Sequence, residues 1–284
     1  MAADVARRSR PGPLLTLGQV RYQLLLLLRS PLGFFITLVI PLLLLITLNV
    51  ITPPTAAKAP GGLRYAQFLT PAISAFCLLN ACYVTTVTSM ALAREQGILR
   101  RLRGTPLPAW AYLGGRAGSA LVTSIVSVAV IITTAVVFFH VTVIWPAMGY
   151  FAAAAALGIM CFFLLGAAVT TAVPKSDTAL PVAYGTVLPL AFISGVFFSS
   201  VHAPHWLDDL ASAFPVAPVA RAMEAAFNPA THTWPMPASG LLVVLGWSAA
   251  AAVVIALAFR WEPGPIRWRA GRTGPGPRGS PPRT

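Results

Sequence analysis

Residues 94–116, REQGILRRLRGTPLPAWAYLGGR, form the stretch that decides the fold of this chain. They are a short charged segment between two long apolar ones. Apolar side chains recur in the segment at helical spacing and share one face, while the arginines occupy the others. The run Thr-Pro-Leu-Pro at 105–108 then ends the helix, because proline has no amide hydrogen to donate. We therefore expect a compact amphipathic helix over 94–104 that protrudes from an apolar domain.

The flanking segments have the composition of a membrane protein. The chain of 284 residues is 57% hydrophobic and only 10% charged, and its mean hydropathy is +0.76. Five charge-free runs reach the roughly 20 residues that cross a bilayer as a helix. One of them is long enough for two crossings, with a turn at His140, Trp145 and Pro146. The sequence thus predicts an all-α integral membrane protein with six spans, near 32–51, 66–92, 112–139, 147–172, 179–200 and 238–259.

The basic residues predict the orientation of these spans. If both termini lie in the cytosol, all of the 20 basic residues except Lys58, Arg64 and Arg221 fall on the cytosolic side, as the positive-inside rule requires. The net charge of +13 is then explained by topology and by anionic membrane lipid, and it calls for no nucleic-acid partner.

The domain organisation follows from the same pattern. We expect a cytosolic N-terminus over 1–31 with an interfacial helix, a transmembrane domain over 32–260, and a basic, disordered cytosolic tail over 261–284. Within the transmembrane domain, residues 204–227 are expected to form two short re-entrant or interfacial helices on the outer side.

Sequence motifs for catalysis, nucleotide binding or metal binding are weak or absent in this chain. There is no G-x-x-x-x-G-K-[ST] loop, so this chain does not hydrolyse ATP by that mechanism. His202 and His205 share a short segment with two aspartates, but Pro204 separates them and no fourth ligand is evident, so the sequence leaves a metal site open without supporting it. An integral-membrane enzyme and an ATPase-independent channel or scaffold remain alternatives to a transporter.

The second predicted span is the most polar, and the fifth carries aromatic residues and prolines. Hydrogen bonding between helices explains such residues, and so does a wall that forms a dimer interface or lines a substrate path. No acidic residue or lysine falls in the middle of a span, which argues against a proton relay and favours an amphipathic or lipid-like substrate. The candidate path residues are Asn80, Tyr83, Thr85, Thr86, Tyr184 and Phe192.

Two stretches carry a resemblance to a known family. Glu95 followed by Gly97, a Leu/Arg alternation and Thr105-Pro106-Leu107 resembles the loop between the second and third helices of ABC-2 type transporter permeases. Residues 194–223, SGVFFSSVHAPHWLDDLASAFPVAPVARAM, resemble the segment between the fifth and sixth helices of that family. The family includes daunorubicin-resistance permeases and exporters of polysaccharide and teichoic acid, and the chain is more similar to the drug-exporter branch.

The resemblance implies a half-transporter in a bacterial cytoplasmic membrane. Two copies of a separate ATPase subunit would bind ATP and Mg²⁺, so this chain would hold no cofactor, and a second permease chain, identical or homologous, would complete the path. The amphipathic helix would dock on the ATPase, although an ordinary loop whose arginines enforce topology is the alternative. The implied coupling residues are Glu95, Gly97, Ile98, Leu99, Arg100, Arg101, Leu102, Thr105 and Pro106.

Overall fold

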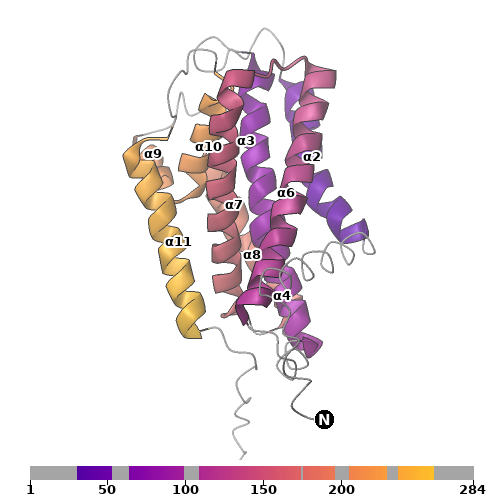
Figure 1. The fold of residues 1–284 in the computed structure, drawn as a ribbon. Coiled ribbons are helices and arrows are strands. Elements are labelled where there is room, and N and C mark those ends of the chain that lie inside the picture. Colours follow the sequence, from indigo (N-terminus) through magenta and orange to yellow (C-terminus); the bar gives the residue numbers. More distant parts are fainter. Residues whose placement is uncertain are drawn as a thin grey trace, which may run out of the picture.

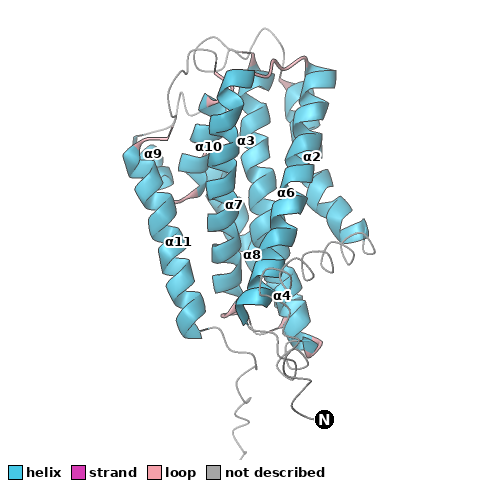
Figure 2. Ribbon diagram, in the orientation of Figure 1, coloured by secondary structure: helices cyan, strands magenta, loops and turns pink. Residues whose placement is uncertain are grey.

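Long helices packed side by side form the structure, a computed structural model that describes residues 31–52, 64–98, 109–173, 175–195, 205–228 and 236–258. Figure 2 shows that the regular elements within these ranges are helical. The predicted all-α fold is therefore confirmed. The long elements are α2 (Pro31–Ile51), a continuous helix over Tyr65–Glu95, α6 (Ala109–Phe139), α7 (Met148–Thr170), α8 (Ser176–Ile193) and α11 (Ala238–Ala258).

The helices alternate in direction, so the bundle has two ends (Figure 1). At one end, called here the Glu95 end, the helix Tyr65–Glu95 stops and α8 begins. At the other, called the Trp145 end, α6 gives way to α7. His140 takes a positive φ of 51° just after α6, and the 3-10 turn η4 (Trp145–Ala147) leads into α7. This confirms the predicted chain reversal between the third and fourth spans.

Five of the six expected spans meet the length and apolarity of a membrane crossing within the described residues: Tyr65–Glu95, Tyr112–Phe139, Trp145–Thr170, Ser176–Ile193 and Ala238–Leu257. The first expected span is present as α2, which has 21 residues. One boundary needs correction. The fifth span was expected to reach residue 200, but α8 ends at Ile193, because Gly195 turns the chain at a φ of +72°.

The helix Tyr65–Glu95 is the core of the bundle and is buried along nearly its whole length. It consists of α3 (Tyr65–Leu79), a π-helical turn η3 (Asn80–Val84) and α4 (Thr85–Glu95). Together these three parts contact α2, α6, α7, α8 and α10. Its position at the centre explains why it tolerates many small polar residues: their hydroxyls bond to carbonyls one turn back, as Ser74 and Thr88 do.

Close backbone contact holds this core helix against α7. A methyl group added to Gly166 would lie 2.9 Å from the carbonyl oxygen of Tyr83 and 3.2 Å from Cβ of Thr86. Only a glycine permits that approach. The contact lies at the π-helical turn, where the amide of Thr85 bonds to the carbonyl of Asn80 in the wider i→i+5 pattern.

Two short helices, α9 (His205–Ser212) and α10 (Val216–Ala225), connect α8 to α11. They correspond to the pair expected over 204–227. α10 is buried against α3 and α7. The side chain of Gln67 fixes its end: Nε2 donates to the carbonyls of Thr142 at 2.7 Å and Phe227 at 3.2 Å, while Oε1 accepts from the amide of Thr142 at 3.0 Å. The placement of this pair within the outer leaflet stays a prediction.

Candidate coupling site and membrane path

The end of α4 corrects the predicted coupling helix. Arg94 and Glu95 were expected in one amphipathic helix over 94–104, but they form the last turn of the core helix. Gly97 then takes a φ of +66°, and its amide bonds to the carbonyl of Arg94 at 3.1 Å. A glycine in this left-handed conformation is a common helix end. The expected continuous helix is therefore broken before Ile98.

The guanidinium of Arg94 reaches across to the end of α7. Its Nη1 donates to the carbonyl of Thr170 at 2.9 Å and to that of Val173 at 3.3 Å. The last carbonyls of a helix have no partner within the helix and carry a partial negative charge. The guanidinium of Arg94 supplies hydrogen bonds to these carbonyls and a positive charge near them, and it joins α4 to α7.

The carboxylate of Glu95 binds the next helix along the chain. Its Oε2 accepts a hydrogen bond from the amide of Ser176 at 3.0 Å. Ser176 is the first residue of α8, and the preceding Lys175 supplies no side-chain cap. Glu95 thus takes the role of the missing N-terminal cap, with a negative charge placed at the positive end of the helix.

Two adjacent side chains of α4 therefore bind the two ends of the connection between α7 and α8. Arg94 binds the end of α7, and Glu95 binds the start of α8. These hydrogen bonds link the end of α4 to two other helices. We call Arg94 and Glu95 the clasp.

Most of the predicted docking residues fall beyond the clasp. Gly97 lies in the turn after α4, and Ile98 follows it with 38% of its surface exposed. The half-buried Gly97 and the exposed Ile98 lie at the Glu95 end, a position compatible with a surface for a partner. The other six lie outside the described residues: Leu99, Arg100, Arg101, Leu102, Thr105 and Pro106.

The candidate path residues fall into two groups. Asn80, Tyr83 and Thr86 are buried inside the bundle, with exposures of 1%, 6% and 4%, and Thr86 faces Gly166 of α7. These three contribute to packing within the chain. Thr85 and Tyr184 are partly exposed, and Phe192 is exposed. The second group, with α8 as its main element, is the surface available to a substrate, to lipid or to a second chain.

A hydroxyl bridge joins the two groups. Tyr83 Oη lies 2.9 Å from Thr186 Oγ1 on α8. The Thr186 hydroxyl already lies within donor distance of two carbonyls of its own helix, those of Val182 and Ala183. Because that hydroxyl has a single hydrogen, we assign Tyr83 as the donor in the bridge. The bridge holds the middle of α8 against the core helix.

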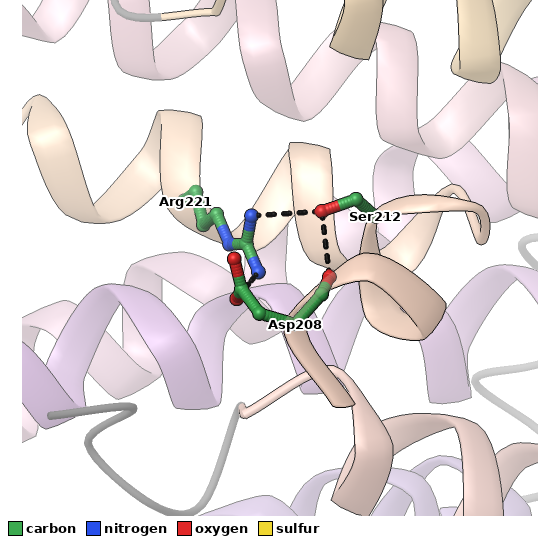
Figure 3. Close-up of polar contacts among 3 residues, drawn as sticks. All are labelled: Asp208, Ser212 and Arg221. Atoms are coloured by element: carbon green, nitrogen blue, oxygen red, sulfur yellow. Dashed lines mark hydrogen bonds and ion pairs between the residues drawn. The ribbon is translucent and has the colours of Figure 1, made fainter. Parts of the chain in front are cut away.

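At the Trp145 end, α9 and α10 are joined by an ion pair (Figure 3). Arg221 of α10 binds Asp208 and also donates to Ser212 Oγ at 3.1 Å. Glu224 lies three residues after Arg221 on the same helix. Burial raises the pKa of Glu224 to about 8, against a smaller lowering by the charge of Arg221. The carboxylate that forms the ion pair with Arg221 is that of Asp208.

Residues that could hold a metal ion do not gather in the described part of the chain: no group of three His, Cys, Asp or Glu side chains is found there. His202 lies outside that part, so a site that involves it stays open. Cys77, Cys82 and Cys161 are free thiols buried in the bundle, as expected for small apolar residues in membrane helices.

Comparison with protein families identifies the chain. The family model for the ABC-2 type transporter matches residues 18–228, well over half of the sequence. The chain belongs to the ABC-2 type transporter family. A comparison with curated proteins gives no match. As an ABC-2 protein with several apolar helices, the chain is a multi-pass membrane permease, and membership of this family implies an ABC ATPase partner.

Sequence reasoning missed three residues that the ABC-2 fold brings into use. Arg94 was placed on a docking helix, whereas it caps α7. Thr186 and Gly166 were not singled out, yet Thr186 bonds Tyr83 and Gly166 permits a close contact between α7 and the backbone of the core helix. The glycine after Glu95-Gln96 was a usable signal for a helix end, but no local pattern indicates which distant helix a side chain will reach.

Proposed function

We propose that this chain is the membrane subunit of a bacterial ATP-driven exporter of the drug-resistance type. It would move an amphipathic, drug-like or lipid-like substrate out of the cytosol. Two copies of a separate ATPase would bind ATP and Mg²⁺, and a second permease chain, identical or homologous, would complete the path. In this arrangement both termini and the Glu95 end face the cytosol.

The end of α4 is the observation that carries the proposal. The chain leaves the core helix at an exposed turn, and a segment with alternating leucines and arginines follows it directly. Apolar side chains flanked by cations suit a cleft on a soluble partner, with the charges fixing orientation. Because the preceding residues bind α7 and α8, a partner that pulls on this segment acts on the bundle as a whole.

The path itself supports an amphipathic cargo. The described spans carry their charged side chains near their ends, as with Arg94, Glu95 and Asp177. Hydroxyls such as those of Thr85 and Tyr184 supply the polar contacts on a mainly apolar surface. A hydrophilic sugar or an ion would meet too few polar partners on such a wall, whereas a molecule with an apolar body and a few hydrogen-bonding groups would be accommodated.

Co-purification from the native host tests the assignment. The chain in mild detergent should bring down a soluble protein with a P-loop, identified by mass spectrometry. Leu99→Asp should abolish this association, together with transport and stimulation of ATP hydrolysis, because a charge on the apolar docking face opposes burial. Gln96→Asp, which adds the same charge to an exposed neighbour, is the matched control.

Two results would contradict the proposal. The first is normal assembly and transport in the Leu99→Asp chain at normal membrane levels. The second is transport by the purified chain alone, which would favour the ATPase-independent channel.

A further inference from the structure

The connection between α7 and α8 is held by side chains from elsewhere in the chain. Thr170 and Val173 are bound by Arg94, and Ser176 by Glu95. α7 is also fixed by extensive packing on α11, α10 and the core helix. α8 packs mainly on α4 and the π-helical turn. Of the two helices that the clasp joins, α8 is the one whose position depends on the core helix.

α8 is attached to that helix at two levels. One is the bond from Ser176 to Glu95 at the Glu95 end, and the other is the bridge from Tyr83 to Thr186 in the middle of the bundle. Ser176 and Thr186 are separated by about 15 Å along α8, at 1.5 Å per residue. A single contact permits a helix to swing, whereas two contacts on one side restrict both its tilt and its rotation.

We propose that Arg94 and Glu95 are positioning residues that make α8 move together with the coupling segment, the predicted docking residues that begin at Gly97. Movement at Gly97 and Ile98 would displace the end of α4, and Glu95 would move α8 together with it. Arg94 would keep the end of α4 bound to α7 during this movement. The exposed face of α8 would then change its position each time the partner closes. The inference rests on the proposed function for the source of the movement, but the clasp can be tested without the ATPase.

The first experiment measures hydrogen exchange on the full chain in lipid nanodiscs. Glu95→Ala should speed exchange of the Ser176 amide about tenfold or more, the effect of losing a charge-assisted hydrogen bond. Glu95→Gln retains an acceptor oxygen and should show a smaller effect, while Gln96→Ala, at the exposed neighbour, should show none. Unchanged exchange at Ser176 in the Glu95→Ala chain would overturn the clasp.

The second experiment follows α8 in the complex with its ATPase. Gly185 points into open space on α8, where an added Cβ has no atom within 4 Å, so Gly185→Cys can carry a bimane fluorophore in a chain whose three cysteines are replaced. Addition of ATP and Mg²⁺ should shift the bimane emission. Glu95→Ala should remove the shift while the ATPase stays bound, and Gln96→Ala should leave the shift in place.

The outcomes separate the two proposals. An emission shift that survives Glu95→Ala, or no shift in the parent chain, would overturn the role of the clasp. Loss of ATPase binding in Glu95→Ala would make Glu95 a docking residue, which also overturns it while the proposed function stands. If no ATPase associates with any variant, the proposed function fails, whereas the exchange experiment still decides whether the clasp exists.

Discussion

Gly166 illustrates how a missing methyl group sets the spacing of two helices. Its neighbours across the contact are the backbone of Tyr83 and Cβ of Thr86, none of which is the flexible end of a long side chain. A clash there cannot be relieved by a change of rotamer, so one helix has to move. At Gly158, by contrast, an added Cβ would meet side chains and no backbone: Cγ1 of Val219 at 2.8 Å and Cε2 of Phe162 at 3.5 Å.

We predict that Gly166→Ala destabilises the chain by about 1–3 kcal/mol, the usual cost of overpacking a closely packed core. Thermal unfolding of the purified chain in detergent measures the effect. Gly246→Ala is the control, since a Cβ at that position of α11 has no atom within 4 Å. Equal melting temperatures for the two variants would show that α7 and the core helix do not approach as closely as described.

At the scale of elements, Gln67 joins three segments that are distant in sequence. Gln67 lies on α3, and its side-chain amide bonds to Thr142 in the turn between α6 and α7 and to Phe227 just after α10. All of its hydrogen-bonding groups that face these segments have partners, although the side chain is only 7% exposed. Such a buried and satisfied amide specifies one arrangement of the Trp145 end.

Replacement of Gln67 by leucine should loosen that end of the bundle. The variant keeps the bulk of the side chain but removes the hydrogen-bond partner of the Thr142 amide and of the Phe227 carbonyl. Each buried polar group left unpaired costs about 1–3 kcal/mol. We expect faster hydrogen exchange at 141–144 and a lower melting temperature. Asn49→Leu is the control, because Asn49 bonds only to a carbonyl one turn back in α2. Unaltered exchange at 141–144 in the Gln67→Leu chain would show that the hydrogen bonds of Gln67 do not stabilise the Trp145 end.

For the whole molecule, the direction of the bundle in the membrane is the property on which the coupling mechanism depends. In the proposed exporter the Glu95 end faces the ATPase, and α9 and α10 then lie on the opposite side. The distribution of basic residues predicts that orientation.

Single cysteines in a chain without Cys77, Cys82 and Cys161 test it in intact cells. A membrane-impermeant thiol reagent should label cysteines placed at Lys58, Asp208 or Arg221, and should label those at Arg101 or Arg272 only after the cells are opened. Asp208 and Arg221 are to be replaced one at a time, because they pair with each other. Labelling of position 101 or 272 from outside would invert the molecule and remove the proposed docking segment from the cytosol.

Composition and periodicity determined the class of this protein. Charge-free runs of sufficient length leave no alternative to membrane helices, because backbone groups in lipid must bond within their own segment. For that reason the positions of the core helix, α6, α7 and α11 followed from the sequence to within a few residues, as did the turn at His140.

The tertiary structure alone decided which helix each polar side chain serves. Arg94 and Glu95 stand side by side in the sequence, yet they bind the end of one helix and the start of the next, 76 to 81 residues away. Tyr83 forms a hydrogen bond with Thr186, and Arg221 forms an ion pair with Asp208 and not with its neighbour Glu224. The physical reason is that membrane helices form from local properties, whereas their side chains pair according to how the helices pack, which no local pattern records.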